Sequence, residues 1–329
     1  MVTQILPIDE NSLALAKEII LNGGVVAFPT ETVYGLAANA YDGKAVESIF
    51  KIKGRPNDNP LIVHVHRDYD ISSLVCTQPQ YSKLLAEAFL PGPLTMVYKS
   101  KKSVSSAVSC GMDTLAVRIP SHSGAQKFLK YVNLPLAAPS ANVSKHVSPV
   151  SAEHVFDDLN GKIPLILDGG KCSGGIESTV LDCTGNVPCV LRSGLVTREM
   201  VAAVVGECDE YVMKDGERVR SPGMKYKHYS PRCQTVLFDY NDREKAYALY
   251  REKQNKGVRV ALLCDSQVAR GCDCSCILNL GETEREIACN LYDKLREGET
   301  FADIIIAVAP LKQDGIMVGV MNRLRKACG

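Results

Sequence analysis

The pattern of apolar and polar residues predicts a chain in which short buried strands alternate with amphipathic helices. Apolar residues recur on one face between residues 9 and 22, and a Gly-Gly pair then ends this predicted helix before an apolar strand at 25–28. Further helices are predicted over residues 42–53, 79–90, 123–131 and 151–159, and further strands over 61–65, 94–99, 114–119, 135–138 and 165–168. Strands that alternate with helices in this way indicate the α/β class.

The pattern changes character at residue 211. Residues 211–233 are polar and interrupted by Pro and Gly, yet the segment SPGMKYKHYSP brings aromatic and basic residues that a flexible Gly/Ser linker lacks. From residue 234 the alternation resumes, with predicted strands at 235–238, 258–264, 277–280 and 304–308 and predicted helices at 241–255, 282–296 and 315–327. We therefore expect one domain over residues 1–210, an ordered linker over 211–233 and a smaller α/β domain over 234–329.

Composition narrows the class of protein. The 329 residues are 46% hydrophobic and 23% charged, which is ordinary for a globular chain of about two domains. The net charge of +1 gives no sign of a nucleic-acid or membrane-surface coat, so any basic site must be local. No apolar run is long enough to cross a bilayer, and the N-terminus lacks the features of a secretory signal. The sequence therefore predicts a cytoplasmic location without membrane association.

The chain contains thirteen cysteines, most of them in apolar segments, where they are typical of small buried hydrophobic residues. Cys272, Cys274 and Cys276 alternate in the segment GCDCSC. Structural zinc sites usually pair Cys as CxxC, with a second pair or histidines elsewhere, and no His lies near this segment. The spacing therefore favours a reducible thiol cluster over a zinc site.

One short stretch, KGRPNDNPLIVH at residues 53–64, carries much of the candidate chemistry. Lys53 and Arg55 lie two residues apart at the end of a predicted helix, and two prolines restrict the turn that follows. A rigid turn that holds two cations beside a strand suits a polyanion such as a nucleoside triphosphate. Two other interpretations stay open. In one, the turn is a solvated loop, and the negative C-terminal end of the helix dipole favours Lys53 at this position. In the other, His64 is an ordinary core residue.

Two further arginines, Arg118 and Arg192, lie within apolar strands. A buried guanidinium needs a carboxylate or a ligand, and few acidic residues are available on the flanking strands. The segments PTETVYGL, PSANVS and GGIESTVLD place Ser, Thr and Asn beside predicted strands, where they can donate neutral hydrogen bonds. The pattern predicts a concave site in which cations and hydroxyls hold an anionic ligand.

Familiar catalytic motifs are missing from the sequence. We find no GxxxxGK[ST], no strand-linked GxGxxG, no HExxH and no GxSxG. Several arginines can nevertheless hold a triphosphate, and nucleotidyl transfer depends mainly on positioning and charge neutralisation rather than on an acid and base pair.

These segments resemble a known family. PTETVYGL, KGRPNDNPLIVH, LPGPLT, TLAVRIPSH, PLAAPSANVS, GGIESTVLD and VLRSG are similar to the YrdC-like domain and follow one another in the family's order. SPGMKYKHYSP, followed by an α/β region that ends in GVMNRLRKA, is similar to the two-domain branch of the threonylcarbamoyl-AMP synthases. The resemblance implies a YrdC-like twisted mixed sheet with helices and a concave basic cavity, followed by a smaller Rossmann-like α/β domain.

The resemblance also implies a reaction. A nucleotidyltransferase of this family converts L-threonine, bicarbonate and ATP into L-threonylcarbamoyl-AMP and pyrophosphate. The carbamate of threonine attacks the α-phosphate, and a partner transferase complex then uses the product to modify the adenosine beside the anticodon of tRNA. Mg²⁺ is expected with ATP, although no residue can be named as its ligand.

Carrying the family's sites over to matching positions gives two sets of residues. The resemblance implies that threonine is held by Thr32, His64, Arg118, the backbone of Ala138, and Ser178. It implies that ATP is held by Lys53, Arg55, Asn59, Thr114, Ser140, Asn142, Ser148 and Arg192, and by His228 or Tyr229 of the linker. Lys53 and Arg55 are the expected catalytic residues.

One segment departs from the family's pattern, and two other functions stay open. Residues 144–149 read SKHVSP where the family often has SGxPSP, so the missing Gly puts the shape of that turn in question. An RNA-binding module without turnover would also suit a concave basic surface, with a weak contact to tRNA, although the low net charge argues against tight binding. Carbamoyl transfer in metallocentre maturation uses a related domain, but within a larger architecture whose CxxC zinc fingers are missing here.

Overall fold

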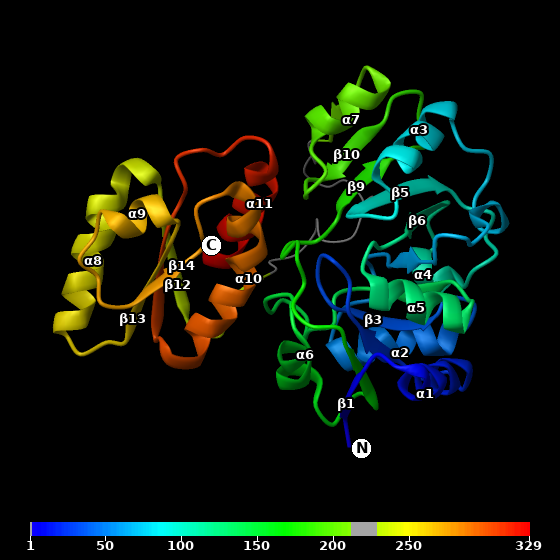
Figure 1. Ribbon diagram of the computed structural model, residues 1–329, viewed down its shortest axis with the longest axis horizontal. Coiled ribbons are helices and arrows are strands. Elements are labelled where there is room, and N and C mark those ends of the chain that lie inside the picture. Colours follow the sequence, from blue (N-terminus) through cyan, green and yellow to red (C-terminus); the bar gives the residue numbers. More distant parts are fainter. Residues whose placement is uncertain (1, 212–228) are drawn as a thin grey trace.

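The computed structural model describes residues 2–211 and 229–329, which form two lobes side by side (Figure 1). The larger lobe comprises residues 2–211 and the smaller one residues 234–329. The predicted linker therefore lies largely outside the described residues, and so does the candidate site residue His228.

The larger lobe is built on a mixed sheet whose strands follow the order β1-β8-β2-β3-β7-β4-β6-β5-β9-β10-β11. Parallel pairs such as β4 with β6 adjoin antiparallel pairs such as β5 with β6, as the mixed-sheet prediction requires. The strands are β1 (Gln4–Pro7), β2 (Val26–Phe28), β3 (Gly35–Asn39), β4 (Ile62–His64), β5 (Leu94–Lys99), β6 (Thr114–Arg118), β7 (Leu136–Ala138), β8 (Leu165–Asp168), β9 (Thr179–Asp182), β10 (Cys189–Arg192) and β11 (Asp209–Glu210).

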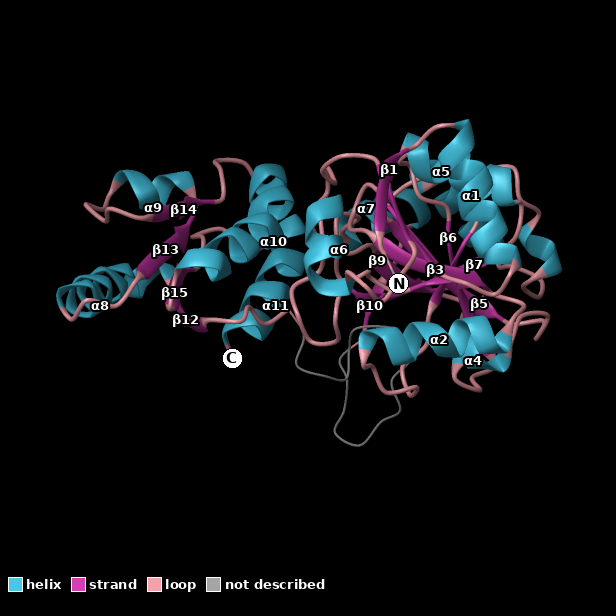
Figure 2. Ribbon diagram, turned by 90° about the horizontal axis from the view of Figure 1, so that it is seen from below, coloured by secondary structure: helices cyan, strands magenta, loops and turns pink. Residues whose placement is uncertain are grey.

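Helices cover both faces of this sheet. Figure 2 shows α1 and α5 on one face and α2 and α4 on the other. Successive residues of β2 serve the two faces, because Val26 and Phe28 pack with α1 and α5 while Ala27 packs with α2. The helices are α1 (Glu10–Leu21), α2 (Gly43–Lys53), α3 (Gln80–Phe89), α4 (Ser106–Ser109), α5 (Ser123–Val132), α6 (Ala152–Leu159) and α7 (Arg198–Val205), with a 3₁₀ turn at Ile71–Ser73.

The ends of the first two helices follow from their sequences. The Asp9 side chain accepts a hydrogen bond of 2.9 Å from the backbone N of Ser12, and this capping box starts α1. Gly54 adopts a left-handed φ of 61° and ends α2. Because this cap turns the chain sharply, Arg55 leaves the helix axis and points toward the cavity described below.

The smaller lobe is a parallel sheet in the order β12-β15-β13-β14, which confirms the predicted Rossmann-like α/β region. Figure 1 shows α10 and α11 on the side that faces the larger lobe, and α8 and α9 on the far side. The elements are β12 (Gln234–Phe238), α8 (Arg243–Asn255), β13 (Val260–Cys264), α9 (Ser266–Arg270), β14 (Ile277–Asn279), α10 (Glu284–Phe301), β15 (Ile304–Val308) and α11 (Ile316–Cys328), with a 3₁₀ turn at Tyr240–Asp242.

The two lobes approach closely where glycines leave room. A Cβ atom added to Gly175 would lie 2.2 Å from the carbonyl oxygen of Ala288 in α10, so a larger residue there would push the lobes apart. Arg296 of α10 and Asp158 of α6 form a buried ion pair of 2.9 Å across the same boundary. The smaller lobe is thus packed directly against the loops of the larger one.

Some elements of the larger lobe were not predicted from the sequence. The segment PTETVYGL was expected to place polar residues beside a predicted strand, and its last residues in fact begin a further strand, β3, which pairs with β2 as an antiparallel hairpin. β1, α4 and α7 were not predicted either, since they are short or only partly apolar. None of the described helices is long and apolar enough to cross a membrane.

Candidate active site

A cavity of about 80 Å³ opens in the larger lobe, and three cationic side chains line it. Arg55 follows α2, Arg118 ends β6 and Arg192 ends β10, so three separate parts of the chain bring one guanidinium each to the same cavity. The residues predicted from sequence that line this cavity are Arg55, His64, Arg118, Ala138, Ser140, Asn142, Ser148, Ser178, Arg192 and Tyr229.

The sheet places His64 beside Arg118. Both residues end their strands, and the parallel pairing of β4 with β6 sets them directly opposite each other in register. His64 is 4% exposed, and its Nδ1 lies 3.1 Å from the carbonyl oxygen of Ile62. Burial and the nearby Arg118 lower the pKa of His64 to about 3. A neutral His64 that donates from Nδ1 keeps Nε2 as a hydrogen-bond acceptor.

Arg118 is paired with an acidic residue that the sequence analysis did not assign to it. Its Nη2 lies 2.8 Å from Oε1 of Glu31, and the Glu31 side chain is 10% exposed. We expected few carboxylates near Arg118 because the flanking strands carry few acidic residues. Glu31 lies instead in the loop after β2. Nε of Arg118 is buried and has no hydrogen-bond partner among the described residues. Arg118 therefore keeps guanidinium donors for a ligand besides the one that Glu31 engages.

Arg55 is held against its own turn. Its Nη2 donates to the carbonyl oxygens of Asn59 at 2.8 Å and Pro60 at 3.3 Å, and the guanidinium lies 5.7 Å from the ring centre of Phe50. Burial lowers the pKa of Arg55 to about 10, which leaves it charged at neutral pH. Its Nε has no partner among the described residues. The rigid turn predicted from sequence thus presents a fixed, partly unsatisfied cation.

Lys53 lies behind the cavity wall rather than in it. Its Nζ donates to the carbonyl oxygens of Ser140 at 2.5 Å and Asn142 at 2.6 Å, and the residue is 3% exposed. Burial, and then the nearby Arg55, lower its pKa well below the usual lysine value. This geometry gives Lys53 a supporting position, because it fixes the segment 140–142 that lines the cavity.

The hydroxyls and the third arginine form the opposite wall. Arg192 donates from Nη2 to the carbonyl oxygen of Ser178 at 2.8 Å, and the Ser178 hydroxyl lies 2.8 Å from that of Thr95. Ser148 donates a hydrogen bond of 2.6 Å to Glu177. The β9 and β10 hairpin therefore carries an arginine and a hydroxyl to one side of the cavity.

Four predicted residues do not line the cavity, and His228 lies outside the described residues. Thr32 is fully buried, with its hydroxyl 2.9 Å from that of Thr30. Asn59 is also buried, and neither atom of its side-chain amide has a partner among the described residues. Thr114 begins β6 opposite Lys99, at the far end of the strand from Arg118. Lys53 is the fourth predicted residue that does not line the cavity.

Sequence reasoning missed several residues of the wall. Thr30, Tyr34, His146 and Glu177 line the cavity as well. Glu177 stands inside the recognised segment GGIESTVLD, so a buried carboxylate between glycines and hydroxyls was the available signal. His146 stands inside the departing segment SKHVSP, and nothing in its neighbours marked it out.

The segment SKHVSP at residues 144–149, which departs from the family's pattern, contains a backbone conformation that favours glycine. Lys145 adopts a φ of 73°, a left-handed conformation that L-residues rarely take. The backbone N of Ser230 donates to its carbonyl oxygen at 3.0 Å, and His146 forms an isolated β-bridge with the same Ser230. Lys145 thus takes a conformation that glycine adopts at lower cost, and it carries some backbone strain.

The described residues provide no protein cage for a metal ion. No group of three or more His, Cys, Asp or Glu side chains among residues 2–211 and 229–329 is placed to hold one. Cys272 and Cys274 instead pack against the core of the smaller lobe. Glu177 is a carboxylate in the cavity wall, but its oxygens are already occupied by Ser148, Tyr292 and Arg323.

The size of the cavity limits what it holds in this conformation. A volume of about 80 Å³ falls well below the several hundred Å³ usual for pockets of small molecules. A nucleotide therefore needs a wider cavity than the one described. Tyr229 is a residue of the linker 211–233 and forms part of the cavity wall.

Comparisons with known proteins match the whole chain. Residues 18–194 match the family model Sua5/YciO/YrdC, which is described as telomere recombination. Residues 196–329 match the model described as threonylcarbamoyl-AMP synthase, C-terminal domain. The threonylcarbamoyl-AMP synthase of Pyrococcus abyssi is 40% identical over 329 residues, which cover 98% of this chain and 95% of the relative.

Two further relatives agree with this assignment. The threonylcarbamoyl-AMP synthase of Bacillus subtilis is 40% identical over 334 residues, which cover 100% of this chain and 96% of that protein. The crystal structure of P. abyssi Sua5 complexed with L-threonine is 39% identical and superposes with a TM-score of 0.89, covering 99% of this chain and 97% of that one. The chain therefore belongs to the threonylcarbamoyl-AMP synthase family, in its two-domain form.

Proposed function

We propose that this chain is an L-threonylcarbamoyladenylate synthase, which makes threonylcarbamoyl-AMP and pyrophosphate from L-threonine, bicarbonate and ATP. The observation that carries the proposal is the convergence of Arg55, Arg118 and Arg192 on one cavity that also presents serine hydroxyls. A carboxylate and a triphosphate are the anions that such a set of donors recognises. The names of the relatives point to the same reaction.

The threonine half-site is proposed at the strand ends of the sheet. The unpartnered Nε of Arg118 donates to the threonine carboxylate, and the neutral His64 accepts a hydrogen bond at Nε2 from the threonine hydroxyl or amine. Ser178 and the backbone of Ala138 line the same cavity and complete the half-site. The relative solved with L-threonine, at 39% identity, supports this substrate.

The ATP half-site is proposed on the side formed by Arg55, Arg192 and Tyr229. Two guanidinium groups neutralise the triphosphate, and Ser140, Asn142 and Ser148 contribute neutral hydrogen bonds. Asn59 and Thr114 remain predicted ATP contacts, and Thr32 remains a predicted threonine contact; none of the three lines the cavity as described. Lys53 is proposed to act by holding the segment 140–142.

The reaction then needs placement more than acid and base catalysis. The threonine amine adds to bicarbonate and releases water, which gives a carbamate. A carbamate oxygen bonds to the α-phosphorus of ATP while the bond from that phosphorus to the bridging oxygen breaks, and pyrophosphate leaves with the electron pair. The two half-sites share one cavity, so they set the distance for in-line attack.

Mg²⁺ is proposed to enter with ATP rather than to reside in the protein. The wall carboxylate Glu177 is engaged by an arginine, a tyrosine and a serine, so it does not fit a direct ligand role. Mg²⁺ commonly binds through substrate phosphates and water, and it would supply further charge neutralisation on the triphosphate.

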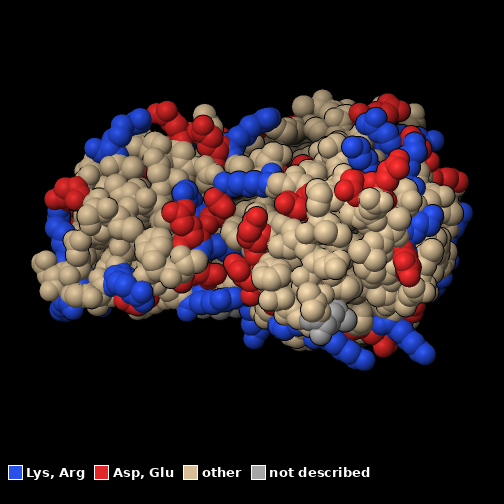
Figure 3. All heavy atoms as spheres, turned by 60° about the horizontal axis from the view of Figure 1, so that its bottom comes forward, with Lys and Arg blue, Asp and Glu red and all other residues tan. Residues whose placement is uncertain are grey.

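The product is proposed to serve a transferase complex that modifies tRNA, in the cytoplasm, where ATP and threonine are at hand. We also propose that residues 1–210 and 234–329 act as two domains joined by the linker 211–233. Figure 3 shows lysine and arginine interspersed with aspartate and glutamate on the face in view, without a broad basic surface. This face gives no support to tight RNA binding as the main task.

Pyrophosphate release from the purified chain tests the proposal. We expect release that requires ATP, threonine and bicarbonate together, and a threonylcarbamoyl-AMP product detectable by mass spectrometry. Equal release without threonine would show that the substrate assignment is wrong. Salt-sensitive binding of tRNA without any turnover would favour the RNA-binding alternative instead.

A further inference from the structure

The cavity wall contains a buried carboxylate on the side proposed for ATP. Glu177 is 8% exposed, and it adjoins Ser178 and hydrogen-bonds Ser148. Burial raises the pKa of Glu177, but the nearby Arg323 and Arg192 outweigh burial and lower it to about 2, so the group is ionised at neutral pH. An anion beside a triphosphate opposes binding unless a cation neutralises it and holds it in place.

That cation comes from the smaller lobe. Arg323 of α11 is fully buried, and its Nε donates to Oε2 of Glu177 at 3.1 Å. The hydroxyl of Tyr292 in α10 donates to the same oxygen at 2.9 Å. The other oxygen, Oε1, is thereby left to accept the hydrogen bond of 2.6 Å from Ser148. Glu177 therefore links two helices of the smaller lobe to a hydroxyl of the cavity.

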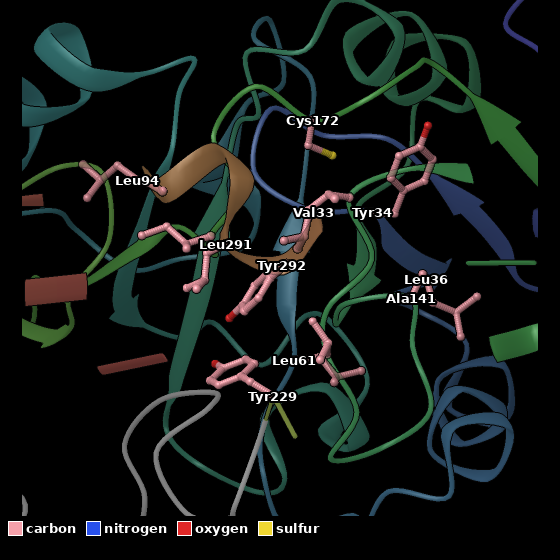
Figure 4. Packing of buried hydrophobic residues seen from close by; sticks show 14 of the residues in the cluster. Val33, Tyr34, Leu36, Leu61, Leu94, Ala141, Cys172, Tyr229, Leu291 and Tyr292 are labelled. Carbon is pink, nitrogen blue, oxygen red and sulfur yellow. The ribbon is translucent and has the colours of Figure 1, made fainter. Parts of the chain in front are cut away.

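The same two residues also hold the aromatic part of the wall. Tyr292 stacks on Tyr229 with ring centres 5.4 Å apart and planes 27° apart, and Figure 4 shows the two rings together. The guanidinium carbon of Arg323 lies 5.9 Å from the centre of the Tyr229 ring. Tyr292 and Arg323 thus contact both Tyr229 and Glu177, two neighbouring parts of the cavity wall.

One other contact between the lobes also reaches the cavity wall, because His146 lies 2.8 Å from Glu299 of α10, but this contact does not involve Glu177. Arg296 and Asp158 form a buried pair across the boundary, and Lys171 and Asp293 form a more exposed one, but none of these four residues lines the cavity. The segment GVMNRLRKA, which contains Arg323, was recognised in the sequence without a role. Of its two arginines, Arg325 is exposed, whereas Arg323 is buried and reaches Glu177.

Building on the proposed synthase activity, we propose that Tyr292 and Arg323 are positioning residues for the ATP half-site. They fix Glu177 so that its Oε1 orients the Ser148 hydroxyl, and Arg323 cancels a charge that would otherwise repel the triphosphate. The smaller lobe therefore completes the site of the larger one, through contacts that do not touch the substrates.

Tyr292→Phe in the full chain tests the positioning role, because it removes the hydroxyl and keeps the stacked ring. We expect the KM for ATP to rise roughly tenfold, the scale of one hydrogen bond to a charged group, while the KM for threonine stays within about twofold. Tyr250→Phe is the matched control: it removes a buried tyrosine hydroxyl of the same lobe that hydrogen-bonds Ser275, and it should change neither KM.

A double-mutant cycle tests the route through Ser148. If Tyr292 acts on ATP by orienting this hydroxyl, Tyr292→Phe should raise the KM for ATP less than about twofold in a Ser148→Ala background. Additive effects of the two changes, or equal rises in both KM values, would overturn the proposal. If the wild-type chain shows no threonine-dependent pyrophosphate release, the proposed function itself is wrong.

Arg323 is tested by comparing two substitutions. Arg323→Lys keeps the charge, so the KM for ATP should stay within about threefold of wild type, whereas Arg323→Gln should raise it more than tenfold. Thermal unfolding of both variants shows whether either fails to fold. If Arg323→Gln folds and binds ATP as the wild type does, the proposal that Arg323 neutralises the charge of Glu177 is wrong. If it does not fold, the Tyr292 cycle decides the proposal.

Discussion

Arg118 and Glu31 form a buried ion pair, with Nη2 of the arginine 2.8 Å from Oε1 of the glutamate and the side chains 4% and 10% exposed. Arg118 lines the site cavity, and Glu31 lines a neighbouring cavity of about 570 Å³, so the pair forms part of the wall between them. A threonine carboxylate at Arg118 must therefore share the guanidinium with Glu31.

This sharing gives a first prediction. Glu31→Gln should lower the free energy of unfolding by about 3 kcal/mol, because it leaves the buried Arg118 charge without its anion. Added threonine should raise the Tm of this variant more than that of wild type, because the substrate carboxylate replaces the missing charge. Thermal unfolding with and without threonine measures both effects.

An exposed pair provides the control. Asp113→Asn breaks the contact of Asp113 with Lys102, whose side chains are 84% and 73% exposed, and it should leave the free energy of unfolding nearly unchanged. The same threonine-induced rise in Tm for Glu31→Gln and wild type would show that threonine does not reach Arg118.

The second prediction separates Lys53 from Arg55. Lys53→Met should destabilise the chain by roughly 2 kcal/mol, because the carbonyls of Ser140 and Asn142 lose a buried donor. Arg55→Lys should leave stability nearly unchanged but raise the KM for ATP about tenfold, since an ammonium cannot reproduce the planar fork of donors. Urea unfolding and pyrophosphate-release kinetics on both variants check this contrast. Wild-type ATP kinetics in Arg55→Lys would remove Arg55 from the ATP half-site.

The third prediction concerns pH and His146, which joins the two lobes. Its Nδ1 lies 3.0 Å from Asp158 and its Nε2 2.8 Å from Glu299 of α10. Burial lowers the pKa of His146, but hydrogen bonds to the two carboxylates outweigh burial and raise it above 6.5. A folded-state pKa above the unfolded value stabilises the chain fully below pH 6.5, and this stabilisation is lost as pH rises through the folded pKa.

Wild type should therefore lose more unfolding free energy than His146→Asn between about pH 6 and pH 8. Urea unfolding at these two values measures the difference. His64 provides an internal contrast, because its lowered pKa of about 3 leaves its contribution intact above pH 6.5 and weakens it only as pH falls. Parallel pH profiles for wild type and His146→Asn would contradict the charged bridge between the lobes.

The fourth prediction concerns the strained turn at Lys145, whose φ is 73°. Lys145→Gly should raise the free energy of unfolding by about 0.5 kcal/mol, because relief of the left-handed strain slightly exceeds the extra entropy of glycine in the unfolded chain. Lys51→Gly, at an exposed position inside α2, should instead cost about 1 kcal/mol. Equal losses in the two variants would show that position 145 carries no strain.

Local features of the sequence predicted much of the fold. The Asp9 cap and the Gly54 stop fixed the ends of their helices, and the apolar runs located most strands, because caps, glycines and apolar runs act over a few residues. β1 (QILP) and β3 (GLAAN) were not predicted, since polar, proline or small residues interrupt their apolar runs and each strand is defined by its partner strand. The domain boundaries and the individual substrate contacts remain predictions.

The family, the α/β class and the arginines and hydroxyls that meet in one cavity could be predicted from the sequence, because they depend on motifs that can be recognised locally. The groups that those residues face depend instead on the packing of distant segments. Lys53 turns to carbonyls 87 and 89 residues away, and Glu177 meets Arg323 across 146 residues. Such pairings depend on how sheets and lobes pack, so no local pattern of residues encodes them.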